Sequence, residues 1–254
     1  MIDDAGAISC RPEETLPPGT LEHLLIDQVL PRVLTHRGYL VIHAGCVATP
    51  HGAIAFVGGS GSGKSTLCAE FARAGHPLLG DDGIVVWRTA AASVEALATY
   101  PGLRLLPAPL ARLFDERAGA APVAHYTAKR RIDGESADLT LATGAETLRV
   151  LYLLDHGVEV SISPLPERDA FMVLLRASFQ LHLDDQERSR EMFERIGGLQ
   201  AAVPVRRLAY PRDFGRLGAV REALMKDAEE LSPDHRVFAI ADASSASLSR
   251  PSFL

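Results

Sequence analysis

The chain has 254 residues, of which 47% are hydrophobic, so it can bury a sizeable core as one large domain or two small ones. Its net charge of −6 argues against general nucleic-acid binding. Three widely spaced cysteines, Cys10, Cys46 and Cys68, suit a reducing cytoplasm, which is the expected location. The N-terminus has no signal-peptide pattern and no apolar run is long enough to span a membrane, so no membrane partner is expected.

The N-terminal residues predict an arm followed by a helix. Residues 1–20 are mostly polar and include several prolines, as an arm would. Apolar residues from Leu21 to Leu30 recur at helical spacing, so a helix is predicted to end near Pro31. The main domain is expected over residues 21–241, and the serine-rich residues 242–254 are predicted to be a disordered tail.

The clearest motif lies at Gly58–Ser65, where the sequence fits G-x-x-x-x-G-K-[ST] at every fixed position. Residues 39–48 and 53–57 predict a β-hairpin that leads directly into this motif, and residues 66–74 predict a helix after it. A strand, a loop and a helix in this order are the context that a phosphate-binding loop requires. A flexible Gly/Ser loop is the alternative.

Each part of this loop has an expected role. The glycines let backbone N–H groups turn inward around a phosphate, and the N-terminus of the following helix adds positive potential. Lys64 is expected to reach the outer phosphates and Ser65 to place its hydroxyl on Mg²⁺, so ATP and Mg²⁺ are the predicted cofactors. The predicted nucleotide-binding residues are Gly58, Gly59, Ser60, Gly61, Ser62, Gly63, Lys64, Ser65 and Thr66.

A pair of carboxylates follows at a distance that suits the same site. The helix after the loop leads about 15 Å away from the phosphates, and the extended residues 76–80 return about 16 Å. Asp81 and Asp82 are therefore expected near the level of the phosphates. The alternative is a solvated Asp-Asp-Gly turn.

The remaining elements are predicted from shorter patterns, and no internal repeat or domain linker is found. Strands are expected within residues 84–87, 91–98, 103–106, 205–208 and 237–240, and helices within residues 109–114, 171–179, 186–196 and 214–228. Residues 148–154 and 158–162 are predicted to pair as a hairpin. The polar stretch 115–138 contains the basic triplet Lys129, Arg130 and Arg131, for which a solvated loop is the alternative to an active role.

These features together resemble a known family. His43, Gly58–Ser65, the helix exit at residues 73–76 and the pair Asp81–Asp82 resemble the catalytic domain of the HPr serine kinase/phosphorylase family, which shares its fold with ATP-dependent phosphoenolpyruvate carboxykinases. The resemblance covers residues 39–88. It implies an α/β fold with a mixed, strongly twisted sheet and the phosphate loop at its centre.

Shorter stretches resemble one branch of that family. Residues 103–105, 129–131, 162–165 and 205–211 look like short HPr-kinase-related proteins, some of which phosphorylate a serine on a lasso-peptide precursor. Only about forty residues precede His43, so the separate N-terminal domain of longer members is not expected. The longer members form hexamers, and a homo-oligomer is left open for this chain.

The resemblance also implies roles for individual residues. Asp81 looks like the general base that takes the proton of the acceptor hydroxyl, and Asp82 looks like its partner at the metal. His43 would orient the base, and the alternative for it is a core histidine bonded to the backbone. Arg130 or Arg131, with Arg130 ranked first, would neutralise charge on the transferring phosphoryl group. Arg104 could do the same from its strand, and cross-strand packing is the alternative for it.

The expected function is therefore that of an ATP- and Mg²⁺-dependent serine kinase. Its substrate would be a peptide or protein that bears the serine, and a lasso-peptide precursor is one candidate. Two alternatives are kept: a kinase of a small hydroxyl metabolite, and a nucleotide-binding regulatory module with little turnover. No Cys/His cluster or nucleophile elbow stands out in the sequence, so neither a structural zinc nor a Ser/His/Asp hydrolase is expected.

Overall fold

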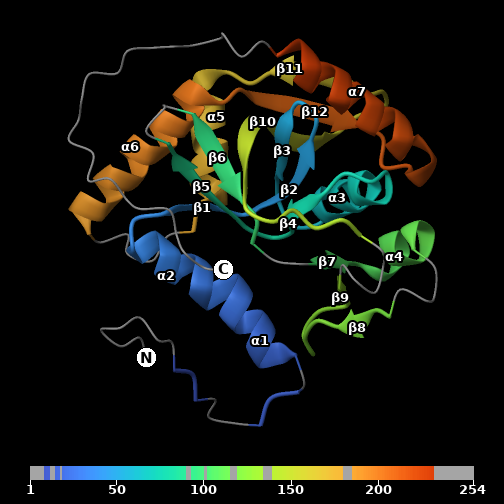
Figure 1. Cartoon of the computed structure of the whole chain (residues 1–254), viewed down its shortest axis with the longest axis horizontal. Coiled ribbons are helices and arrows are strands. Elements are labelled where there is room, and N and C mark those ends of the chain that lie inside the picture. Colours follow the sequence, from blue (N-terminus) through green and yellow to red (C-terminus); the bar gives the residue numbers. More distant parts are fainter. Residues whose placement is uncertain are drawn as a thin grey trace.

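The computed structural model describes residues 9–11, 15–17, 19–89, 93–99, 102–114, 119–133, 139–179 and 185–231. Figure 1 shows a twisted sheet in the middle of the molecule with helices packed against it. Within these ranges, no helix has both the length and the apolar character that crossing a membrane would need. The strand predicted at residues 237–240 and the tail predicted at residues 242–254 lie outside the described residues.

Two sheets and a set of helices make up the described part of the chain. The large sheet contains β1 (Leu40–Ile42), β2 (Ala44–Thr49), β3 (Gly52–Val57), β4 (Leu78–Gly80), β5 (Ile84–Arg88), β6 (Val94–Leu97), β10 (Ala145–His156), β11 (Ser161–Pro164) and β12 (Val205–Tyr210). The small sheet contains β7 (Gly102–Leu105), β8 (Ala121–Pro122) and β9 (Arg130–Asp133). The helical elements are α1 (Thr20–Leu24), the π-helical η1 (Leu25–Val29), α2 (Leu30–His36), α3 (Lys64–Arg73), α4 (Pro107–Leu113), α5 (Glu167–Ala177), α6 (Gln186–Ala202), the 3₁₀ segment η4 (Phe214–Arg216) and α7 (Leu217–Glu230).

The strand order places the phosphate loop in the middle of the large sheet. The strands lie in the order β1-β5-β6-β10-β3-β2-β4. β3 pairs in parallel with β10 and antiparallel with β2, so the strand that leads into the loop is flanked on both sides. Because β3 and β12 both pair with residues 151–153 of β10, they lie on opposite edges of that strand. The prediction of an α/β fold with a mixed sheet is confirmed.

Alternating side chains of β3 face two separate cores. Ile54 and Phe56 belong to the core that includes residues of α3 and α7, whereas Ala55 and Val57 belong to the core that includes residues of α5 and α6. All four side chains are fully buried. A strand that is apolar on both faces reads as a continuous apolar run, which is how the sequence shows it.

The first helix continues past the proline at which it was predicted to end. α1, η1 and α2 follow one another without a break from Thr20 to His36. The π-helical turn η1 lies directly before Leu30 and Pro31, where an ordinary helical turn would lack one hydrogen bond and clash with the proline ring. The prediction of an end near Pro31 was therefore wrong.

Two predictions about strands were also wrong. The strand expected over residues 39–48 is divided at His43, because β1 pairs with β5 whereas β2 pairs with β3 and β4. The hairpin expected from residues 148–154 and 158–162 does not form, because β12 lies between β10 and β11. Leu208 of β12 pairs with Leu154 on one side and with Ile162 on the other.

Candidate functional site

The phosphate loop between β3 and α3 needs its glycines for two reasons. Gly58, Gly61 and Gly63 have φ angles of 153°, 73° and 106°, which side chains disfavour. In addition, a Cβ on Gly63 would lie 2.3 Å from the hydroxyl oxygen of Tyr210, and one on Gly58 would lie 2.8 Å from the Ser62 hydroxyl oxygen. Glycine is therefore strongly favoured at these positions of the loop.

Lys64 folds back onto its own loop. Its ammonium donates hydrogen bonds to the carbonyl oxygens of Gly58 at 2.7 Å and of Gly59 at 3.1 Å. Burial lowers the pKa of Lys64, and the nearby carboxylate of Asp82 opposes this shift. A phosphate would offer the ammonium a charged acceptor, which makes a stronger hydrogen bond than a carbonyl does.

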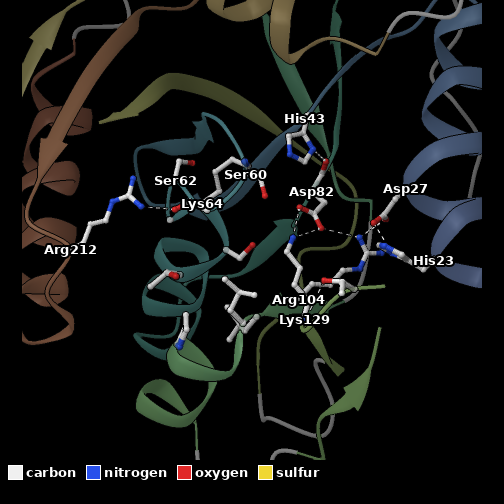
Figure 2. Close-up of a pocket in the computed structure, with 18 of the residues that line it drawn as sticks. His23, Asp27, His43, Ser60, Ser62, Lys64, Asp82, Arg104, Lys129 and Arg212 are labelled. Carbon is white, nitrogen blue, oxygen red and sulfur yellow. Dashed lines mark hydrogen bonds and ion pairs between the residues drawn. The ribbon is translucent and has the colours of Figure 1, made fainter. Parts of the chain in front are cut away.

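A cavity of about 680 Å³ opens at the loop, a volume typical of small-molecule sites. Figure 2 shows Lys64 near the middle of this region, with Arg212 on one side and Asp82, Asp27 and His23 on the other. The loop residues that line the cavity are Ser60, Gly61, Ser62, Gly63, Lys64, Ser65 and Thr66. Of the residues predicted to bind the nucleotide, Gly58 and Gly59 do not line the cavity and instead hold Lys64.

Asp81 lies beneath the cavity and not in its wall. The residue is 1% exposed and is not among those that line the cavity. Its Oδ2 accepts a hydrogen bond from the backbone N–H of Arg104 at 2.8 Å. Its Oδ1 is buried without a hydrogen-bond partner. Burial, reinforced by the neighbouring Asp82, raises the pKa of Asp81 to about 7.

Asp82 is the member of the pair that faces the cavity. Its φ of 79° is uncommon for a residue other than glycine, and such conformations occur often at functional sites. Its Oδ2 lies 3.3 Å from Arg104 Nη1 and 3.3 Å from Lys129 Nζ. Although burial opposes ionisation, Lys129, Arg104 and His43 hold the pKa of Asp82 below its ordinary value. The pair is buried, so it is not a solvated turn.

His43 supports the turn at Asp82 and also lines the cavity. Its Nδ1 lies 2.6 Å from the carbonyl oxygen of Asp82, and its backbone N–H donates to the carbonyl of Ala177. Burial and then the charge of Lys64 lower the pKa of His43. His43 thus bonds to the backbone, as its alternative interpretation expected, but its partner is the carbonyl group of Asp82, the residue whose carboxylate faces the cavity.

The N-terminal helix contributes two site residues that no motif indicated. Asp27, in η1, pairs through Oδ1 with Arg104, and its Oδ2 lies 2.8 Å from Nδ1 of His23. Both residues line the cavity. Because Arg104 also contacts Asp82, its guanidinium joins the helix to the carboxylate pair. The only signal in the sequence is that two ionisable residues four positions apart interrupt an otherwise apolar helix face.

The basic triplet does not converge on one point. Lys129 is the only one of the three residues that lines the cavity. Arg130 donates to the carbonyl oxygen of Ala120, and Arg131 pairs with Glu22 at 2.8 Å. The arrangement therefore favours Lys129, and not Arg130, as the cation that the triplet supplies to the site.

The chain that follows β12 supplies a further cation. Arg212 lines the cavity and donates to the carbonyl oxygen of Gly61 at 2.6 Å. The Tyr210 hydroxyl donates to the carbonyl oxygen of Ser62 at 3.4 Å, so two side chains of this segment contact the loop. The family resemblance covers residues 205–211 and ends directly before Arg212, which explains why the sequence did not indicate it.

No protein-family model and no curated protein matches the sequence. Among solved structures, the fold is similar to the HPr(Ser) kinase/phosphatase from Coxiella burnetii, with a TM-score of 0.41 and 12% sequence identity. The similarity covers 74% of this chain and 90% of that chain. Because the identity and the TM-score are both low, the function has to be argued from the geometry of the site.

Proposed function

We propose that the chain is an ATP- and Mg²⁺-dependent kinase that transfers the γ-phosphoryl group to a serine hydroxyl of a peptide or protein. The observation that carries the proposal is that the phosphate loop and Asp82 line one cavity, with the buried Asp81 directly before Asp82 in the chain. Phosphoryl transfer needs a polyphosphate cradle, a proton acceptor and cations, and this cavity combines all three. The sequence resemblance supports serine as the acceptor, including a serine of a lasso-peptide precursor.

The residues at the loop fit a magnesium ion. Ser65 offers a hydroxyl, Asp81 has a buried oxygen without a hydrogen-bond partner, and Asp82 adds a second carboxylate. Mg²⁺ prefers such oxygen ligands and usually combines one or two carboxylates with phosphates and water. In the described ranges, no group of three or more His, Cys, Asp or Glu side chains could hold a metal alone. The ion would therefore be bound together with the nucleotide and would neutralise charge on its β- and γ-phosphates.

The remaining side chains would manage charge and protons. Lys64 would give up its hydrogen bonds to two backbone carbonyl groups and bind the outer phosphates. Lys129 and Arg104 lie beside Asp82, where the serine hydroxyl of the substrate would enter. The transfer forms a bond between the serine oxygen and the γ-phosphorus and breaks the bond from that phosphorus to the β-phosphate. The hydroxyl proton passes to a carboxylate, which acts as the general base.

The two aspartates differ in how they suit the role of the base. Asp82 has the position, because its carboxylate faces the cavity. Asp81 has a pKa of about 7, and a base is most effective when its pKa lies near the working pH. The assignment of Asp81 as the base stays a prediction. The exchange of each aspartate for asparagine separates them, since loss of the base costs about 10²- to 10⁴-fold in kcat while ATP still binds.

The proposal is tested by incubating the protein with ATP, Mg²⁺ and candidate serine peptides and weighing the products. We expect the addition of one phosphate to a serine, and we expect Lys64→Ala to abolish both this addition and tight ATP binding. Lys226→Ala is the matched control, because Lys226 is an exposed lysine of α7 far from the loop in sequence. Unchanged ATP affinity in Lys64→Ala would contradict the phosphate-loop assignment.

The same experiment separates the two alternatives. Phosphorylation of a free hydroxyl metabolite, with all peptides unchanged, would favour a metabolite kinase. Binding of the nucleotide without transfer to any acceptor would favour a regulatory module with little turnover.

A further inference from the structure

We infer that the base of the donor nucleotide lies in an apolar cleft beside the phosphate loop and that this cleft accepts adenine and guanine alike. The base cleft, as we call it, is the part of the cavity lined by Leu106 and Pro109, at the start of α4, and by Phe214 and Leu217, at the start of α7. The inference rests on the proposed function, since it assumes that the loop binds the phosphates of a nucleoside triphosphate.

The position of the acceptor residues fixes the direction in which the nucleotide extends. In-line transfer places the acceptor oxygen and the leaving β-phosphate on opposite sides of the γ-phosphate. Figure 2 shows Asp82 and Asp27 at one end of the region and Arg212 at the other, with Lys64 between them. The nucleotide therefore has to extend away from Asp82, past the first turn of α3.

At that end of the cavity, two helices flank α3. Figure 1 shows α4 on one side of α3 and α7 on the other, and both pack against it. Leu106 precedes α4 and is 44% exposed, which leaves a large apolar side chain in water. Phe214 lies in η4, directly before α7, and is half-buried. A base between them would cover Leu106 and stack on the ring of Phe214. Such stacking stabilises any nucleobase, because every base has a π-face.

Arg212 contacts the loop and lies two residues before Phe214 of the base cleft in the chain. Its exposed guanidinium donates to the carbonyl oxygen of Gly61, in the same way as Lys64 donates to Gly58 and Gly59. A guanidinium binds a phosphate more strongly than it binds a carbonyl, because the phosphate is charged and can accept two parallel hydrogen bonds. Arg212 would therefore move from the loop to the phosphates when the nucleotide binds.

Among the described residues, the polar side chains that line the cavity and are not part of the phosphate loop or the carboxylate cluster already contact other groups of the protein. Asp213 is the carboxylate next to the cleft, and its Oδ1 already accepts from the N–H of Gly215 at 2.8 Å. The polar residues Gln28, Tyr126 and Thr127 contact Arg32, His23 and Lys129 respectively. A site that hydrogen-bonds the polar edge of its ligand rejects an analogue without the matching groups by about 10⁴-fold or more. An apolar pocket discriminates only weakly between similar ligands. Adenine and guanine should therefore bind with similar affinity.

The test is calorimetric titration of the full chain with Mg²⁺ and each of three ligands: ATP, GTP and inorganic tripolyphosphate. We expect the dissociation constants of ATP and GTP to agree within about tenfold and tripolyphosphate to bind at least about fivefold more weakly, because it lacks the stacked base. Leu106→Ala should weaken the binding of ATP and of GTP by about fourfold or more, which is the effect of one buried methylene group. The affinity for tripolyphosphate should not change. Arg212→Ala should weaken all three ligands.

Met172→Ala is the control, because Met172 is an apolar residue of similar exposure on α5 that does not line the cavity. A preference of more than tenfold for either nucleotide overturns the inference. So does a Leu106→Ala variant that binds nucleotides normally or that loses tripolyphosphate to the same extent. Failure of the unmodified protein to bind any of the three ligands would instead overturn the proposed function.

Discussion

At the scale of single residues, Arg104 explains how the carboxylates of the site are held. Its backbone N–H bonds to Asp81, and its guanidinium contacts both Asp82 and Asp27. The residue is 2% exposed, and a buried cation is tolerated only when it is paired and hydrogen-bonded. The sequence placed Arg104 on a strand but not these contacts, because the two carboxylates that its guanidinium contacts lie 22 and 77 positions away.

Asp81 should make the stability of the metal-free, nucleotide-free protein fall as the pH rises. Its pKa is about 7 in the folded protein against 3.8 ordinarily, so the folded state keeps a proton that the unfolded chain has lost. The stabilisation is complete below the ordinary pKa and is lost as the pH rises through the folded pKa, by up to about 1.4 kcal/mol per pH unit. Urea denaturation of the unmodified protein and of Asp81→Asn at about pH 5 and about pH 8 measures it.

The expected result is that the stability of the unmodified protein, relative to Asp81→Asn, decreases between the two pH values. The asparagine variant cancels the contributions of other titrating groups, including Asp27, whose pKa burial also raises. A stability difference that does not change with pH would show that Asp81 is ionised in the folded protein throughout this range.

At the scale of elements, the sequence predicted correctly those helices, strands and loops whose placement depends on residues close together in the chain. The hairpin of β2 and β3, the phosphate loop and α3 follow from a motif whose parts are adjacent in the chain, and the return to Asp81 and Asp82 follows from the length of one helix and one extended segment. The contribution of the helix from Thr20 to His36 could not be predicted in this way. An apolar periodicity shows that one face is buried but not which distant residues it is buried against.

Asp27 should affect turnover although it lies on the N-terminal helix. Asp27→Asn removes the charge that holds one side of the Arg104 guanidinium, so Arg104 would be free to neutralise Asp82 more strongly. We expect kcat to fall by about tenfold, as for other residues that orient a site through a neighbour, while the KM for ATP changes little. Steady-state kinetics at saturating peptide would measure both constants.

Glu22→Gln is the matched control for this variant. Glu22 lies on the same helix and also pairs with an arginine, but its partner Arg131 does not line the cavity at the loop. Asp27→Glu should recover part of the lost kcat, because it restores the charge. If Asp27→Asn lowers only the thermal stability and leaves kcat unchanged, the contact between Asp27 and Arg104 is structural alone.

At the scale of the whole molecule, the fold class could be predicted but the neighbours of the strands could not. The predicted strands at residues 148–154 and 158–162 are close in sequence and separated by a short turn, which favoured a hairpin. The structure instead inserts β12 between them, some fifty residues later in the chain, because β12 offers a parallel partner to β10 and an antiparallel partner to β11. Pairing of this kind depends on long-range contacts, and alternation within each strand does not encode them.

The same region of the molecule holds α7, which forms one wall of the base cleft, against the sheet. The Tyr152 hydroxyl of β10 donates to Asp227 Oδ2 of α7 at 2.7 Å, and Arg206 of β12 pairs with Asp227 Oδ1 at 3.1 Å. Tyr152→Phe keeps the buried ring and removes only the hydrogen bond to a charged acceptor. We expect the free energy of unfolding in urea to fall by about 1.5–3 kcal/mol.

Glu230→Gln is the control, because it breaks an exposed ion pair with Lys226 on the same helix. It should lower the free energy of unfolding by less than about 1 kcal/mol. Because Tyr152 does not line the cavity, Tyr152→Phe should still bind tripolyphosphate normally at a temperature where the protein is folded. Its affinity for ATP should be the more sensitive quantity, since α7 carries Leu217 into the base cleft. A Tyr152→Phe variant no less stable than Glu230→Gln would show that α7 is held by its apolar face alone.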